Sequence, residues 1–117
     1  MHKSFSIKQR LRSFKYAFNG IKLLWQEPNA KLHFIATIIV IIAGLVRHIS
    51  QQQWIALFGA IGMVWITEAI NTSIEKLCDY ACGGKYDPII KTVKDIAAAA
   101  VVIAAAVSIV IGIFIFF

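Results

Sequence analysis

The chain has 117 residues, of which 59% are hydrophobic, and its mean hydropathy is +0.73. This composition excludes an ordinary soluble domain of this size and indicates a small integral membrane protein. The formal net charge of +6 could suggest a nucleic-acid partner, but the basic residues flank apolar runs and no nucleic-acid motif accompanies them. We therefore expect the basic side chains to meet anionic lipid headgroups and not nucleic acid.

Residues 1–27 predict an amphipathic helix that lies in the membrane interface. The apolar positions alternate in steps of four and three, with basic residues between them, and they are Ile7, Leu11, Phe14, Phe18, Ile21 and Trp25. A cytoplasmic helix packed on a partner protein is the alternative. Pro28 disfavours helical conformation at Glu27, so we expect the helix to end in the turn at 26–29.

Three apolar runs are long enough for transmembrane helices, which need about 20 residues each. We place them at 32–49, at 54–82 with an extension beyond the bilayer, and at 89–117. The prediction is thus one all-α membrane domain over 1–117, with an interfacial helix and three transmembrane helices. Gly59, Gly62 and the alanines of the last run predict close helix packing. His33 and His48 are interpreted as interfacial polar residues and not as ligands.

Lysines and arginines predict the orientation in the membrane. Those before the first span are Lys3, Lys8, Arg10, Arg12, Lys15, Lys22 and Lys31, and those near the second connection are Lys76, Lys85, Lys91 and Lys94. Between the first two spans there is Arg47 alone. Because basic loops stay on the cytoplasmic side, we expect the N-terminus and the second connection in the cytoplasm, the C-terminus outside, and the chain in the inner (cytoplasmic) membrane.

A polar, acidic stretch follows the second apolar run without a break. At about 100° per residue, Glu68, Asn71, Glu75 and Asp79 fall within an arc of roughly 80° on one helix face. Ionisable side chains beside a bilayer are costly and mark functional sites by default. The simpler interpretation is a helix end that frays into water with solvated charges.

Five of the six acidic residues lie between 68 and 95, and the sixth, Glu27, can approach them from the interface. Carboxylates gathered with Lys85 and Lys94 suit a nucleotide site in which oxygen ligands hold Mg2+ and lysines meet phosphates. Glu68, the deepest of the carboxylates, could accept a proton from a hydroxyl at bilayer depth. A small oligomeric cation channel or transporter would use the same residue types.

The stretch E-A-I-N-T-S-I-E-K-L-C-D at 68–79, followed by Lys94-Asp95 before the last apolar run, resembles the prokaryotic diacylglycerol kinase family, which includes the undecaprenol kinases. The segment S-F-K-Y-A-F-N-G at 13–20 and the Glu27 turn resemble its N-terminal part, so the resemblance covers nearly the whole chain. It implies a homotrimer of three-span subunits that transfers the γ-phosphate of ATP to a lipid hydroxyl with Mg2+.

The resemblance also implies a role for each matching residue. Glu68 would be the base that acts on the lipid hydroxyl, and Glu27 and Glu75 the metal ligands, with Asn71 and Asp79 in support. The implied nucleotide contacts are Tyr16, Lys85, Tyr86, Asp87, Lys94 and Asp95, with Arg10 or Arg12 as further candidates. Pro28 and the Gly83-Gly84-Lys85 sequence depart from many relatives.

The acceptor lipid stays open between diacylglycerol and undecaprenol, although the S-F-K-Y-A-F start is closer to the undecaprenol branch. Two competing hypotheses remain beside the kinase. One is the cation channel or transporter, which predicts ion flux without ATP consumption. The other is a relative that binds lipid without turnover.

Overall fold

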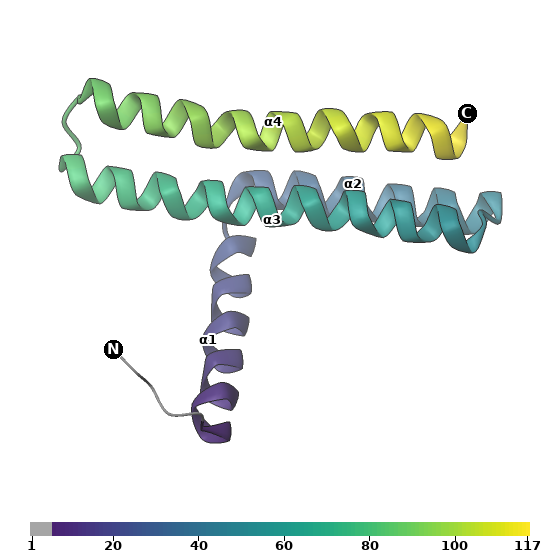
Figure 1. The fold of residues 1–117 in the computed structure, drawn as a ribbon, viewed down its shortest axis with the longest axis horizontal. Coiled ribbons are helices and arrows are strands. Elements are labelled where there is room, and N and C mark those ends of the chain that lie inside the picture. Colours follow the sequence, from purple (N-terminus) through teal and green to yellow (C-terminus); the bar gives the residue numbers. More distant parts are fainter. Residues whose placement is uncertain (1–5) are drawn as a thin grey trace.

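The computed structural model describes residues 6–117, which form four α-helices joined by short connections (Figure 1). The helices are α1 (Ile7–Trp25), α2 (Pro28–Arg47), α3 (Gln51–Cys82) and α4 (Pro88–Phe116). The long helices α3 and α4 form a hairpin, α2 packs on α3, and α1 leaves this group at a steep angle. Residues 1–5 of the predicted interfacial helix lie outside the described part of the chain.

Local capping explains where each helix begins. Pro28 occupies the first turn of α2, where a missing backbone N–H costs nothing, so α2 begins there and not at 32. Ser50 and Gln53 form a capping box at the start of α3, in which each side chain bonds the other's backbone N–H. Because of this capping box, α3 begins at Gln51 and not at the predicted residue 54. Asp87 caps α4, which begins at Pro88.

Within residues 6–117, α2, α3 and α4 are each long and apolar enough to cross a membrane, which confirms the prediction of three candidate spans. The 32 residues of α3 correspond to a helix of about 48 Å, whereas the hydrocarbon core is about 30 Å thick. The helix therefore extends well beyond a bilayer. In Figure 1 its C-terminal part and the start of α4 reach past the beginning of α2, where α1 branches off.

Small residues mediate the closest helix contacts. Ala60 of α3 and Ala104 of α4 are both buried, and the Ser108 hydroxyl donates a hydrogen bond of 3.2 Å to the Ala60 carbonyl. A Cβ at Gly44 of α2 would lie 2.8 Å from the Trp54 ring of α3. Gly59 and Gly62 behave differently, because a Cβ there would meet nothing within 4 Å in the described part of the chain. The prediction of close approach at these two glycines is thus wrong within one chain.

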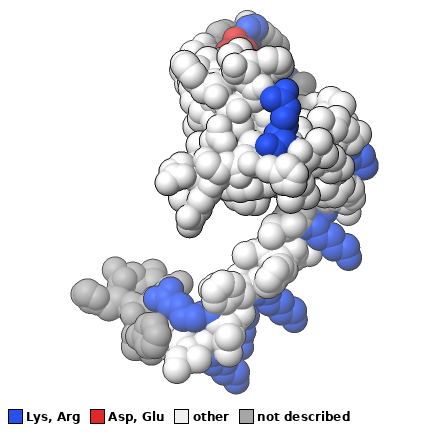
Figure 2. Space-filling model, turned by 90° about the vertical axis from the view of Figure 1, so that its right-hand side faces the viewer, with Lys and Arg blue, Asp and Glu red and all other residues white. Residues whose placement is uncertain are grey.

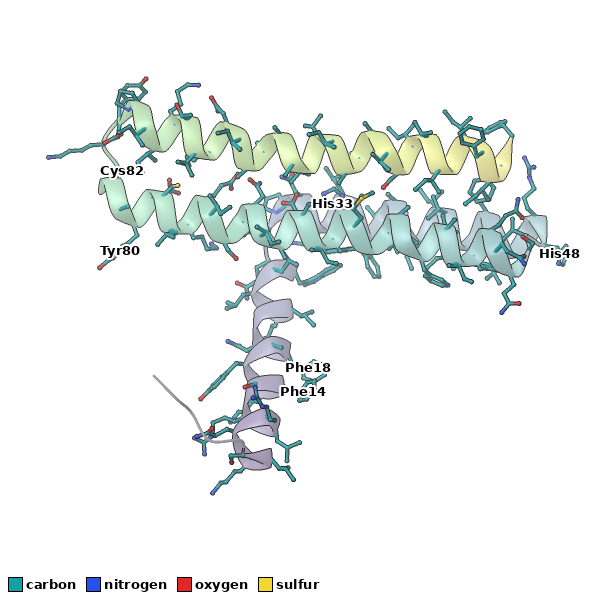
Figure 3. The ribbon with its side chains drawn as sticks, in the orientation of Figure 1. Phe14, Phe18, His33, His48, Tyr80 and Cys82 are labelled. Atoms are coloured by element: carbon teal, nitrogen blue, oxygen red, sulfur yellow. The ribbon has the colours of Figure 1, made fainter. Side chains whose placement is uncertain are left out.

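None of the 19 residues of α1 is buried, and all of them except Leu24 are exposed. Figure 2 shows basic side chains recurring along this helix, beneath the largely uncharged surface of the other helices. The apolar side chains of α1 are equally open, and Phe14 and Phe18 project from it in Figure 3. A surface of this kind is stable only against lipid or another protein, and the location of α1 in the membrane interface stays a prediction.

Candidate active site

Glu68 is the most buried carboxylate of the acidic stretch, with 3% of the residue exposed. Its Oε2 lies 3.3 Å from Nε2 of His33, which comes from α2 (Figure 3). Its Oε1 accepts a longer hydrogen bond of 3.5 Å from the Thr72 hydroxyl, one turn further along α3. Both oxygens of this buried carboxylate therefore have a polar partner, as burial of a charged group demands.

A second layer of contacts fixes His33 against α3. The Thr37 hydroxyl donates to the His33 carbonyl at 2.7 Å and accepts from the Trp65 indole N–H at 3.1 Å. The His33 and Trp65 rings meet edge to face, with their centroids 6.0 Å apart. His33, which the sequence indicated as an interfacial polar residue, thus takes part in a polar contact between α2 and α3.

Sequence reasoning missed His33 because it lies 35 positions from Glu68 and outside the acidic stretch. A signal was nevertheless present. His33, Thr37 and Val40 follow the spacing of one helix face and line the same cavity between α2, α3 and α4. Two polar residues on the buried face of a membrane helix are unusual enough to indicate a contact with polar groups.

The predicted metal ligand Glu75 lies two turns from Glu68 along α3, toward the α3–α4 turn. The Asn71 amide donates to Oε1 of Glu75 at 3.2 Å, and the Asn71 carbonyl oxygen is buried without a hydrogen-bond partner among residues 6–117. Glu27, in the turn between α1 and α2, pairs with Lys76 at 3.1 Å. The turn between α1 and α2 therefore contacts α3 at Lys76, the residue that follows Glu75 in the chain.

No group of three or more His, Cys, Asp or Glu side chains in residues 6–117 is arranged to hold a metal ion. Protein Mg2+ sites often use only one or two carboxylates, with substrate phosphates and water as the other ligands. Glu27, Glu75 and the unpartnered Asn71 oxygen supply oxygen donors alone, so these residues fit Mg2+ held jointly with a nucleotide. A metal ion at Glu27 would displace the Lys76 ammonium.

Near the α3–α4 turn, ion pairs join the charged residues. Lys94 contacts Asp79 at 2.6 Å across the two helices, and Lys91 contacts Asp95 at 2.6 Å along α4. These side chains are far more exposed than Glu68. The predicted support residue Asp79 thus positions a predicted nucleotide contact.

A surface hollow of about 460 Å3 lies at this turn. Of the predicted nucleotide contacts, the ones that line it are Lys85, Tyr86, Asp87 and Lys94. Asp87 also accepts hydrogen bonds from the backbone N–H groups of Ile89 and Ile90, so it has a structural role as a cap that the sequence analysis did not include. Tyr16 on α1 and Asp95 on α4 are exposed and do not line this hollow in the described part of the chain.

The three long apolar helices indicate a membrane protein, in which a carboxylate is buried between α2 and α3 and exposed ion pairs lie near the α3–α4 turn. The sequence model for prokaryotic diacylglycerol kinase matches residues 15–116. The chain belongs to this family.

Characterised relatives agree with this assignment. The chain is 36% identical to the undecaprenol kinase of Bacillus subtilis over 109 residues, which cover 90% of this chain and 85% of the relative. It is 31% identical to the diacylglycerol kinase of Synechocystis over 87% of this chain and 59% of the relative. For the diacylglycerol kinase of Helicobacter pylori the identity is 28%, with coverages of 84% and 77%. The chain is thus an enzyme of a lipid kinase family, and the channel alternative gains no support.

Proposed function

We propose that this protein transfers the γ-phosphate of ATP to the hydroxyl group of a membrane lipid. The observation that carries the proposal is the burial of Glu68 at the membrane end of the acidic face, with both oxygens held by His33 and Thr72. An oriented carboxylate at this depth can accept the proton of a hydroxyl that a lipid presents from within the bilayer.

The residues nearer the α3–α4 turn would bind the nucleotide. Glu27 and Glu75 would hold Mg2+, while Asn71 keeps Glu75 in place through its amide hydrogen bond. When bound, Mg2+ would neutralise the negative charge that develops on the phosphate oxygens during transfer. Lys85 and Lys94 would meet phosphate oxygens, and Tyr86 would contact the nucleotide from the same hollow. Tyr16 and Asp95 would complete these contacts from α1 and α4.

Undecaprenol is the acceptor that we favour, with diacylglycerol as the alternative. The identity to the Bacillus subtilis undecaprenol kinase, 36%, is higher than the 31% and 28% to the two diacylglycerol kinases. These values differ by little, so the acceptor has to be decided by experiment.

The active unit that we propose is a homotrimer in the cytoplasmic membrane. No large side chain in residues 6–117 is fully buried within one chain, and the spans expose many large apolar residues. Other subunits can cover part of this surface, and a site between subunits can enclose both ATP and a lipid. The N-terminus and the α3–α4 turn would face the cytoplasm, and α1 would rest on anionic headgroups.

The test is phosphate transfer from labelled ATP by protein purified in detergent. Diacylglycerol and undecaprenol are offered in parallel mixed micelles with Mg2+. Label in undecaprenyl phosphate supports the favoured acceptor, and label in phosphatidic acid supports the alternative. Folded, oligomeric protein that labels neither lipid contradicts the proposed function, and ion flux through liposomes by that protein would revive the channel hypothesis.

A further inference from the structure

The contact between His33 and Glu68 indicates a functional residue outside the acidic stretch. We propose that His33 is a positioning residue, whose imidazole holds the Glu68 carboxylate in the orientation in which it accepts the lipid proton. The inference rests on the proposed function, because it assigns His33 a part in the same transfer.

Glu68 needs hydrogen-bond donors in the form in which it acts as a base. A base must be ionised before it accepts a proton, and an ionised carboxylate with 3% exposure needs hydrogen-bond donors. Thr72 supplies one donor at 3.5 Å, which is longer than the usual O–H···O distance of about 2.5–3.0 Å and makes this a weak bond. Nε2 of His33, at 3.3 Å from the other oxygen, is the donor from a second helix. Together they stabilise the carboxylate and fix its plane.

His33 is itself held in place. Its backbone carbonyl accepts from Thr37, its ring contacts Trp65, and Trp65 in turn donates to Thr37. A side chain whose backbone and ring are both restrained loses little freedom when it bonds a partner. This arrangement resembles the orienting partner of a catalytic base, which sets the position of the reacting group.

His33 acts through Glu68 and takes no covalent part in the reaction. As the lipid oxygen bonds to the γ-phosphorus, the bond from that phosphorus to the bridging oxygen breaks and ADP leaves. The hydroxyl proton passes to Glu68. Without the imidazole donor, Glu68 loses its fixed orientation, so turnover should fall while binding of ATP and lipid persists.

The experiment compares three substitutions of one residue. His33→Leu removes the donor, His33→Gln places an amide N–H near the position of Nε2, and His33→Asn places it too short to reach Glu68. His48→Asn and His48→Gln are matched controls, because His48 lies exposed at the opposite end of α2 (Figure 3) and asparagine tolerates the left-handed backbone of His48. Each variant is measured for kcat, for KM of both substrates and for oligomeric state.

We expect His33→Leu and His33→Asn to lower kcat by about 10- to 100-fold, the effect of losing a hydrogen bond to a charged group. His33→Gln should recover most of this loss, and KM should change little in all three. The two His48 variants should match the wild type. Equal kcat values for folded His33→Gln and His33→Asn would overturn the inference. This comparison remains decisive even if His33→Leu does not fold.

A double-mutant cycle separates positioning from general support of the fold. If His33 acts through Glu68, His33→Leu should cause little further loss in a chain that already carries Glu68→Gln. Effects that multiply would show that His33 works independently, which contradicts the inference. If the wild type is active and the His33→Leu variant has the same kcat, the role of His33 is refuted but the proposed function is not. A folded wild type that phosphorylates no lipid refutes the proposed function and the inference with it.

Discussion

The two halves of α3 both carry acidic side chains, but these side chains lie in different surroundings. In the half covered by α2, Trp54 packs on Gly44 and Glu68 meets His33, with Glu68 almost fully buried. In the half that extends past α2, Asp79 pairs with Lys94, and the two side chains are 65% and 37% exposed. A buried carboxylate depends strongly on its partners, whereas exposed ion pairs contribute little. The contacts with α2 therefore fix the geometry of Glu68, whereas the ion pair of the extension is open to water and less constrained.

The largest effect should come from the covered half, at Glu68. Glu68→Gln keeps the shape of the side chain but removes the base, so we expect kcat to fall by about 100-fold or more. ATP binding should remain, since the nucleotide residues lie nearer the α3–α4 turn. Turnover and ATP binding are measured on the same purified oligomer. Near-normal turnover would exclude Glu68 as the base.

The packing of the covered half is tested by a pair of glycines. Gly44→Ala forces a methyl group against the Trp54 ring, 2.8 Å away, whereas Gly59→Ala meets open space within the described chain. We expect Gly44→Ala to be about 1–3 kcal/mol less stable than Gly59→Ala, the usual result of overpacking. The midpoint of unfolding in detergent gives this difference. Equal midpoints would mean that α2 is free to move away from α3.

The sequence predicted the helices better than their ends. Hydropathy located the three spans, because a membrane helix must be apolar over its whole length. The start of α3 was missed although Ser50 and Gln53 have the spacing of a capping box. Placing the start of the second span at 54 overlooked that local signal.

The site was predictable within one helix and not between helices. Glu68, Asn71 and Glu75 follow from helical spacing, and the Asn71–Glu75 hydrogen bond is a contact of that kind. The pairs His33–Glu68 and Glu27–Lys76 join separate helices. Their register depends on how Gly44 and Trp54 pack, which no spacing along the chain reveals.

An intermediate effect is expected at Glu75, where the extension begins. Glu75→Gln removes the charge of a proposed metal ligand, so the Mg2+ concentration for half-maximal activity should rise about tenfold. Activity is measured over a Mg2+ titration at saturating ATP. Glu68→Gln is the internal control, because its residual activity should require as much Mg2+ as the wild type. An unchanged requirement in Glu75→Gln would remove Glu75 from the metal ligands.

The smallest effect should come from the outer end of the extension. Asp79→Asn breaks the pair with Lys94, but both side chains already reach water, so the melting temperature should change little. Ionic strength provides a direct check, since at about 1 M salt the screening length falls to about 3 Å. The difference in melting temperature between variant and wild type should vanish there. A large loss that persists in high salt would mean that Asp79 and Lys94 are shielded from water in the assembled protein. The outer end would then be as rigid as the half of α3 beneath α2, and the contrast between the two halves would belong to the single chain alone.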